Sequence, residues 1–153
     1  MSIKDVVKKQ YQQIVNKTAT HGRQLAMPAE GWLVTVRKAL GMSAATLARR
    51  MGKSRALVSQ TEKAELAGGV TLTTMTTMAK AMNCKFVYAI VPDDTIEGIL
   101  YQQALKKATQ TVKRSSTHMA LEDQILTKDQ MDLEIERLAR DLLRDMPSDF
   151  WTL

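Results

Sequence analysis

Apolar residues recur every three or four positions near the start of the chain, the spacing of a helix with one apolar face. Over residues 3–16 these positions include Ile3, Val7, Tyr11 and Ile14. Ser2 stands where a helix N-cap is expected, since a serine side chain accepts hydrogen bonds from the first backbone N–H groups. The pattern predicts a helix over residues 3–16, followed by a linker over residues 18–30.

From Trp32 onward the spacing predicts short helices separated by tight turns. The first covers residues 30–40. Ser43 and Ser54 are each expected to cap a further helix, over residues 44–51 and 55–63, and Gly52 supplies the turn between these two. Two short helices joined by a glycine-containing turn form a helix-turn-helix unit.

Apolar residues at matching positions are expected to lock this unit together. Leu47, Leu57 and Val58 should pack between the two helices, where Ala48 must be small. Thr71 opens another helix through residue 82, whose methionines Met75, Met78 and Met82 lie on the predicted core face.

Residues 85–91 have a different pattern, rich in β-branched and aromatic side chains, which predicts a single strand ended by Pro92. A lone strand has unpaired backbone groups on both edges, so we expect it to pair with the same strand of a second copy. The expectation is a homodimer whose dimer strand comprises Phe86, Val87, Tyr88, Ala89, Ile90 and Val91.

Two more helices are predicted after this strand. One starts near Asp93 and Asp94 and weakens over residues 114–117, and the other is opened by a capping box of Thr127 and Gln130. The last helix has an apolar seam that could complete the dimer, pack on its own subunit or bind a partner protein. The pair Phe150 and Trp151 after it could anchor a partner or pack on the helix.

The composition excludes several classes of protein. The single Cys84 gives no disulfide framework, and with His21 and His118 it forms no zinc-site spacing, so we expect no metal and no cofactor. We also expect no enzyme activity and no small-molecule ligand, because no nucleophile–base, metal or phosphate-loop arrangement is present. No apolar run is long enough to span a membrane, which together with the single cysteine favours a cytoplasmic protein.

The charge of +6 is distributed unevenly over the 153 residues. Residues 1–31 carry +3, residues 32–83 carry +6 with only two acidic groups, and residues 84–153 carry −3. A basic middle segment is typical of proteins that bind polyanions, above all double-stranded DNA.

The second helix of the predicted unit is expected to enter the major groove of an operator. The candidates for contacting bases are its outward residues Arg55, Ala56, Ser59 and Gln60. The candidates for contacting phosphates are Ser43, Arg49, Arg50, Lys53, Ser54 and Lys63. The alternative for such a basic face is a solvated surface without a ligand.

Residues 32–84 resemble the helix-turn-helix of phage repressors and Cro, the xenobiotic-response-element (XRE) family. Ser54, Val58, Ser59 and Glu62 match its recognition-helix pattern. Ala44 stands where that family often has glutamine, so a contact common in relatives is expected to be missing.

Further motifs resemble the mobile mystery protein A family. They are residues 31–33, 36–43, 62–65, 87–92 and 119–124. The resemblance implies a regulator encoded on mobile elements beside a Fic-domain partner, in the manner of an antitoxin beside a toxin.

We therefore expect an all-α protein with a lambda-repressor-like helix-turn-helix domain, one C-terminal dimerising β-strand and additional helical arms. The expected segments are an N-terminal helix and linker (1–29), the DNA-binding domain with its strand (30–92) and a C-terminal arm (93–153). The expected function is a sequence-specific transcriptional regulator, an autorepressor with an antitoxin-like role. The alternative is a protein-binding antitoxin whose C-terminal helices neutralise a partner enzyme, with DNA binding secondary.

Overall fold

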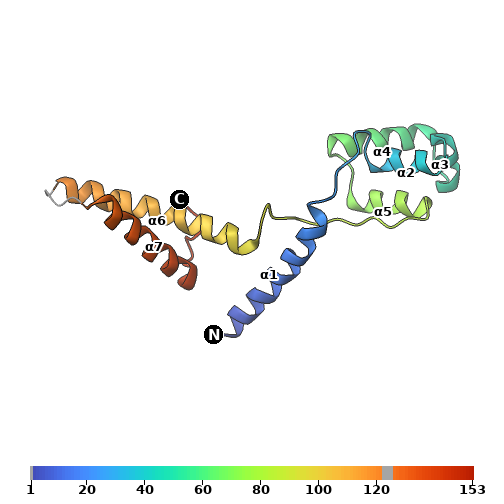
Figure 1. Ribbon diagram of the computed structural model, residues 1–153. Coiled ribbons are helices and arrows are strands. Elements are labelled where there is room, and N and C mark those ends of the chain that lie inside the picture. The colour runs from blue at the N-terminus through green and yellow to red at the C-terminus, as the bar shows by residue number, and fades with distance from the viewer. Residues whose placement is uncertain (1, 122–125) are drawn as a thin grey trace. The chain divides into compact units, whose positions relative to one another are not determined.

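A computed structural model describes residues 2–121 and 126–153 of the chain, and in these residues it contains seven helices and no strand (Figure 1). The helices are α1 (Ile3–Gly22), α2 (Trp32–Ala39), α3 (Ala44–Met51), α4 (Arg55–Ala67), α5 (Leu72–Ala81), α6 (Ile96–Leu121) and α7 (Lys128–Asp145). The chain divides into two compact units, one of residues 24–89 and one of residues 1–23 with 90–153. Glu122–Gln124, the end of one motif quoted above, lie outside the described residues.

The unit of residues 24–89, called here the helix-turn-helix unit, consists of α2 to α5 around one apolar core. Its fully buried side chains include Leu33 of α2, Leu47 of α3, Val58 of α4 and Met78 of α5. Met75 and Met82 are also buried, as their spacing predicts. Every one of the four helices therefore contributes a large apolar side chain to the same core.

The unit of residues 1–23 and 90–153, called here the helical unit, has a different core made where α6 and α7 pack together. Ala104 and Ala108 of α6 and Ala139 of α7 are fully buried, and Phe150 from the C-terminal tail is only 1% exposed. Small residues at a helix crossing let the two backbones approach closely. The apolar seam of α7 thus packs on its own subunit, and Phe150 belongs to this core.

The C-terminal tail is held against α6 by polar contacts as well. The Gln103 side chain donates a 2.9 Å hydrogen bond to the Phe150 carbonyl, and Lys107 Nζ forms an ion pair of 3.1 Å with Asp149. Pro147 follows the residue that ends α7, Met146, which has a left-handed backbone. The tail therefore turns back onto the helix pair.

Helix α1 is attached to the helical unit by its C-terminal part. Asn16 donates a 2.8 Å hydrogen bond to the Glu97 carboxylate and accepts one of 2.9 Å from the Ile96 backbone, and Ala19 is completely buried. This packing carries the helix to Gly22, so the prediction of a linker beginning at residue 18 is wrong. Tertiary contacts here extend the helix beyond the point at which its apolar pattern fades.

The predicted dimer strand is wrong: residues 82–95 contain no helix or strand in the structure. Phe86 is half-buried against the core, whereas Val87, Tyr88 and Ile90 are exposed. High β-propensity describes side chains suited to a pleated, half-buried surface, and it forms a strand only where a neighbouring strand supplies hydrogen bonds. The fold is thus all-helical, and the predicted weak point over residues 114–117 is also absent because α6 continues to Leu121.

None of the helices in the described residues is both long and apolar enough to cross a lipid bilayer.

Candidate nucleic-acid interface

The candidate interface is built from α3, the turn at Gly52 and α4, with each helix capped as its sequence predicts. The Ser43 hydroxyl accepts a 3.0 Å hydrogen bond from the Thr46 backbone N–H, and the Ser54 hydroxyl accepts one of 3.1 Å from Leu57. Gly52 has φ of 65°, a left-handed conformation that costs residues with a Cβ more than it costs glycine. Ser43 thus fixes the start of α3, Gly52 its end and Ser54 the start of α4.

The core side of the two helices confirms most of the predicted locking residues. Leu47, Ala48 and Val58 are buried where α3 and α4 pack together. Leu57 does not follow the prediction, because its side chain is 42% exposed. Only one of the two adjacent apolar residues of α4 can point into the core, since neighbouring positions on a helix differ by about 100°.

Five predicted DNA-contacting residues share one side of α4. At about 100° per residue, they lie within an arc of about 140°, roughly opposite the side that carries Val58. Ser59 is half-buried and the other four are exposed. They are Arg55, Ala56, Ser59, Gln60 and Lys63.

The remaining predicted phosphate contacts are all exposed: Ser43 lies at the start of α3, and the others lie at the end of α3 and in the turn before α4. Ser43 and Ser54 are committed to capping their own helices through their hydroxyl oxygens. Arg50 Nε donates a 2.8 Å hydrogen bond to the Ala81 carbonyl, so this side chain also holds the end of α5. Arg49 lies beside Thr46, with 3.4 Å between Nη2 and the hydroxyl oxygen.

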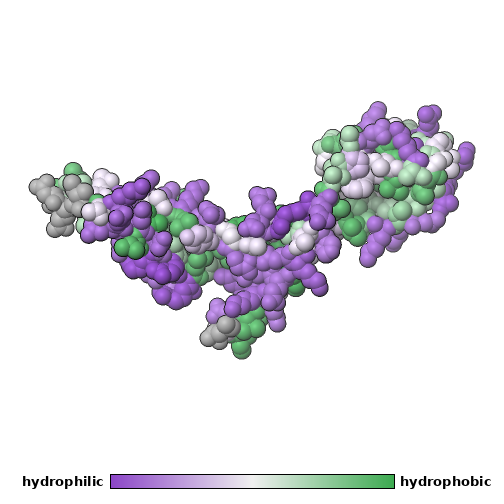
Figure 2. Space-filling model, viewed as in Figure 1, coloured by the Kyte–Doolittle hydropathy of each residue, from purple (hydrophilic) through white to green (hydrophobic). Residues whose placement is uncertain are grey.

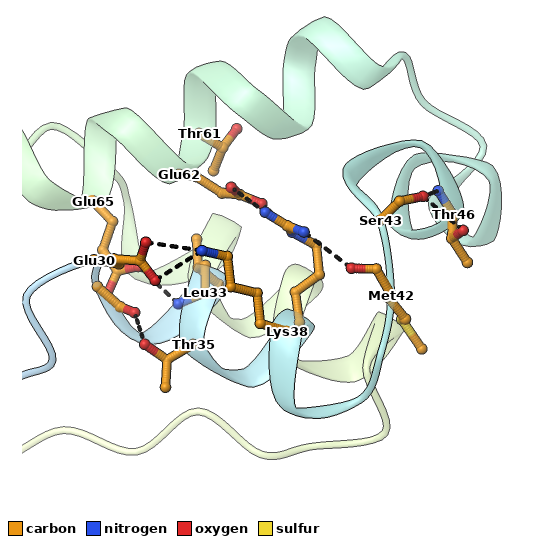
Figure 3. A network of polar contacts seen from close by, with 12 residues as sticks. Glu30, Leu33, Thr35, Lys38, Met42, Ser43, Thr46, Thr61, Glu62 and Glu65 are labelled. Atoms are coloured by element: carbon orange, nitrogen blue, oxygen red, sulfur yellow. Dashed lines mark hydrogen bonds and ion pairs between the residues drawn. The ribbon is translucent and has the colours of Figure 1, made fainter.

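The three acidic residues of the helix-turn-helix unit are all engaged with α2 or with the residues just before it (Figure 3). Glu62 forms a two-point ion pair with Arg37, at 2.6 Å to Nε and 3.1 Å to Nη2. This hydrogen-bonded pair raises the pKa of Arg37 above its usual value. Glu30 pairs with Lys38 at 2.9 Å on the surface.

Glu65 acts differently, because its partner is the backbone. Its two carboxylate oxygens accept hydrogen bonds of 2.8 and 2.9 Å from the N–H groups of Trp32 and Leu33, at the N-terminus of α2. Gly31 has φ of 85°, and a Cβ there would lie only 2.9 Å from the Glu65 carboxylate. The left-handed backbone favours glycine at this position, and a Cβ would also displace the Glu65 carboxylate from its hydrogen bonds to α2.

The engagement of Glu30, Glu62 and Glu65 has an electrostatic consequence. Among the described residues of this unit, the only ion pairs join Arg37 to Glu62 and Lys38 to Glu30. The cations of α3, the turn and α4 are in none of them. These residues, Arg49, Arg50, Lys53, Arg55 and Lys63, are called here the cationic edge.

The structural roles of Glu62 and Glu65 were not among the predictions from the sequence. Their spacing in the sequence does indicate burial. Glu62 lies four positions and Glu65 seven positions after the buried Val58, so all three are on the same face of α4. A carboxylate on the core face of a helix needs a partner, because burial of an unpaired charge is costly.

Comparison with known families agrees with this geometry. Residues 33–88 match the family described as HTH_3: Helix-turn-helix. No curated protein and no solved structure matched the chain. The match covers α3, the turn and α4, whereas the resemblance to mobile mystery protein A stays a prediction. Residues 33–88 of this chain are a helix-turn-helix domain.

Proposed function

We propose that the chain is a sequence-specific DNA-binding regulator of transcription that inserts α4 into the major groove of an operator. The observation that carries this proposal is the cationic edge, which keeps its charge because the unit's acidic groups are used elsewhere. Duplex DNA is a dense line of negative charge, and neutralising its phosphates releases counterions. The helix-turn-helix match supports the same conclusion.

Arg55, Ala56, Ser59 and Gln60 are the proposed base contacts. Arg55 is the first residue of α4, where a recognition helix places its base-contacting side chains, and its guanidinium can bond guanine O6 and N7 together. Gln60, one turn further along, can pair with adenine, and Ala56 can contact a thymine methyl group.

Arg49, Arg50, Lys53, Lys63, Ser43 and Ser54 are the proposed phosphate contacts. The contacts described above indicate that these residues contribute unequally to the salt dependence of binding. Lys53 and Lys63 extend from the turn and from α4 without an ion-pair partner in the described residues, and should contribute most of the salt dependence. Arg50 is expected to contribute less, because its Nε is bonded to Ala81.

The experiment is selection of bound duplexes from a random pool, followed by titration of the selected site. Arg55→Ala should weaken binding by about 1–3 kcal/mol and relax the choice of base at one position. Lys53→Ala should weaken all sequences alike and lower the salt slope by about one. Lys80→Ala is the matched control, since this exposed cation of α5 lies outside the cationic edge.

The outcomes separate the roles of the residues. If Arg55→Ala leaves the selected sequence unchanged, α4 does not contact bases through this residue. If the wild-type chain selects no sequence and binds no duplex at low salt, the proposal is overturned.

We further propose that the protein acts in a bacterial cytoplasm as a homodimeric autorepressor. One helix-turn-helix unit covers one half-site, and two copies would place their recognition helices about 34 Å apart or at a multiple of that distance. The antitoxin-like role beside a Fic-domain protein is proposed from the resemblance to mobile mystery protein A. Co-expression with a Fic protein encoded next to the gene, followed by co-purification, tests the pairing.

The second candidate function, a protein-binding antitoxin, is favoured by one feature of α7. Leu133 is 66% exposed on a helix that carries six acidic residues. Truncation after Thr117 would remove α7 and uncover the α6 core, so Leu133→Asp is the cleaner variant. Loss of co-purification with DNA binding retained would place the partner site on α7.

A further inference from the structure

The N-terminal part of α1 carries a row of large apolar side chains that its own chain leaves exposed. Ile3 is 84% exposed, Tyr11 67% and Ile14 63%, and Val6 and Val7 are also exposed. They follow the three- and four-residue spacing of a single helix face. In Figure 2, apolar side chains are open to solvent at the N-terminal end of α1.

A groove continues this face toward α6. One wall comes from α1, including Ile3, Val7 and Tyr11, and the other is formed by Ile96, Leu100, Met146 and Trp151. The groove has a volume of about 570 Å³, and its surface is almost entirely apolar. We call the exposed apolar residues of α1 and this groove together the α1 surface.

Apart from the capping box of Ser2 and Asp5 in its first turn, the first half of α1 has little to stabilise it within one copy. Among the described residues, the polar contacts of α1 with the rest of the helical unit begin at Asn16. A single helix of this length is marginal in water, and helices in proteins gain most of their stability from packing an apolar face. The α1 surface therefore needs a cover.

The charge distribution of the helical unit indicates what kind of molecule can bind the α1 surface. Residues 1–23 carry five basic groups and one acidic group, or +4, whereas residues 90–153 carry eight basic and twelve acidic groups, or −4. Lys4 and Lys8 of α1 line the groove, and on the opposite wall Ile96 and Met146 have the acidic neighbours Glu97 and Asp145 in the sequence. The helical unit thus combines the basic helix α1 with an acidic segment, residues 90–153, of the same chain.

We propose that the α1 surface binds the same surface of a second copy of this chain across a two-fold axis. An interface of this kind must be self-complementary, because each patch meets itself. The α1 surface satisfies this requirement. Apolar side chains lie on both walls of the groove, and the basic α1 of one copy can face the acidic residues Glu97 and Asp145 beside the opposite wall of the other copy. Duplex DNA does not fit this surface, because the groove is almost entirely apolar and DNA presents charged phosphates.

This inference deepens the proposed function and rests on it in one respect: an operator with two half-sites requires two copies. It also assigns the dimer contact to a surface other than the segment over residues 85–91.

The test is sedimentation equilibrium of the full chain, with two matched double variants. Ile3→Glu/Tyr11→Glu places charges on the α1 surface, and glutamate is a good helix former that is favourable near a helix N-terminus. Ile90→Glu/Tyr88→Glu makes the same replacements at residues that are 92% and 72% exposed in the segment after α5.

The expected result is a wild-type dimer whose dissociation constant rises at least about a hundredfold in Ile3→Glu/Tyr11→Glu, because each lost apolar contact occurs twice in a symmetric dimer. The control variant should keep the wild-type constant. A monomeric wild type, or a dimer weakened only by the control variant, would overturn the proposal.

Two further measurements keep the result interpretable. Hydrogen exchange of the backbone amides of residues 3–15 in the unmodified protein should slow as concentration rises, and protection independent of concentration would contradict the inference. Titration with selected DNA separates the two proposals. A dimer that binds no DNA refutes the proposed DNA binding and leaves the α1 interface standing. DNA binding by a monomer refutes the α1 interface and the proposed homodimer, and leaves sequence-specific DNA binding standing.

Discussion

The two units of this protein use different means to hold helices together. The helix-turn-helix unit fills its core with large side chains such as Leu47 and Met78 and adds a largely buried ion pair between Arg37 and Glu62. The helical unit brings α6 and α7 together at alanines, and among its described residues Phe150 is the one large side chain that is fully buried. Several short helices need bulky side chains to fill the space between them, whereas two long helices can bury small residues along their length.

The units also differ in charge. The nine basic and three acidic residues of the helix-turn-helix unit account for the entire +6 of the chain, and the helical unit is neutral. A strongly basic surface attracts nucleic acid and repels copies of itself, and a neutral surface with exposed apolar side chains permits association. The difference agrees with the proposals that the helix-turn-helix unit binds DNA and that the helical unit forms the dimer contact.

The largest predicted effect tests whether each core stabilises its own unit. Phe150→Ala should lower the free energy of unfolding of the helical unit by about 3–5 kcal/mol, because it removes the largest buried side chain of that core and leaves a cavity. The two tryptophans allow separate measurement, since Trp32 lies in the helix-turn-helix unit and Trp151 in the helical unit.

Urea unfolding would be followed in a Trp32→Phe background for the helical unit and in a Trp151→Phe background for the other unit. Leu153→Ala, at an exposed tail position, is the control. An equal shift of the Trp32 transition would mean that the units unfold as one.

The next effect concerns the largely buried ion pair of Arg37 and Glu62 in the helix-turn-helix unit. Glu62→Ala should cost about 3 kcal/mol, because it leaves Arg37 largely buried without its carboxylate. The loss falls at the lower end of the usual range, since Arg37 keeps its 3.0 Å hydrogen bond to the Met42 carbonyl.

Urea unfolding of a Trp151→Phe protein measures this cost. The double variant Arg37→Met/Glu62→Met should recover most of the stability, because it removes both charges. If Glu62→Ala alone were neutral, the pair would add nothing to the fold of the unit.

The smallest predicted effect concerns the N-terminus of α2. Glu65→Ala should cost about 1–2 kcal/mol, because the backbone N–H groups of Trp32 and Leu33 lose their acceptors. Glu65→Gln keeps one acceptor oxygen and should recover part of the loss.

The same single-tryptophan unfolding assay, with Trp32 as the probe, measures the difference. Lys38→Met, which breaks the exposed pair with Glu30, should change stability by less than about 1 kcal/mol and serves as reference. An effect of Glu65→Ala no larger than that of Lys38→Met would show that water replaces the cap.

Much of the helix-turn-helix unit could be predicted from local sequence. Ser43, Ser54 and Thr71 cap the helices that follow them, and Leu47, Ala48 and Val58 are buried as expected. Helix caps and core spacing are readable because they depend on residues a few positions apart. The assignment of bases and phosphates to individual residues of α3 and α4 stays a prediction.

The sequence by itself determined where most helices begin, which methionines face the core and where positive charge accumulates, since these properties belong to neighbouring residues. Only the tertiary structure decided that Glu65 caps α2 from α4, that Glu62 neutralises Arg37, that α1 continues to Gly22, and that residues 85–91 form no strand. Each of these depends on a partner far away in the chain. Hydrogen bonds and burial depend on which groups lie close together in the folded chain, and the sequence near a residue does not specify its distant neighbours.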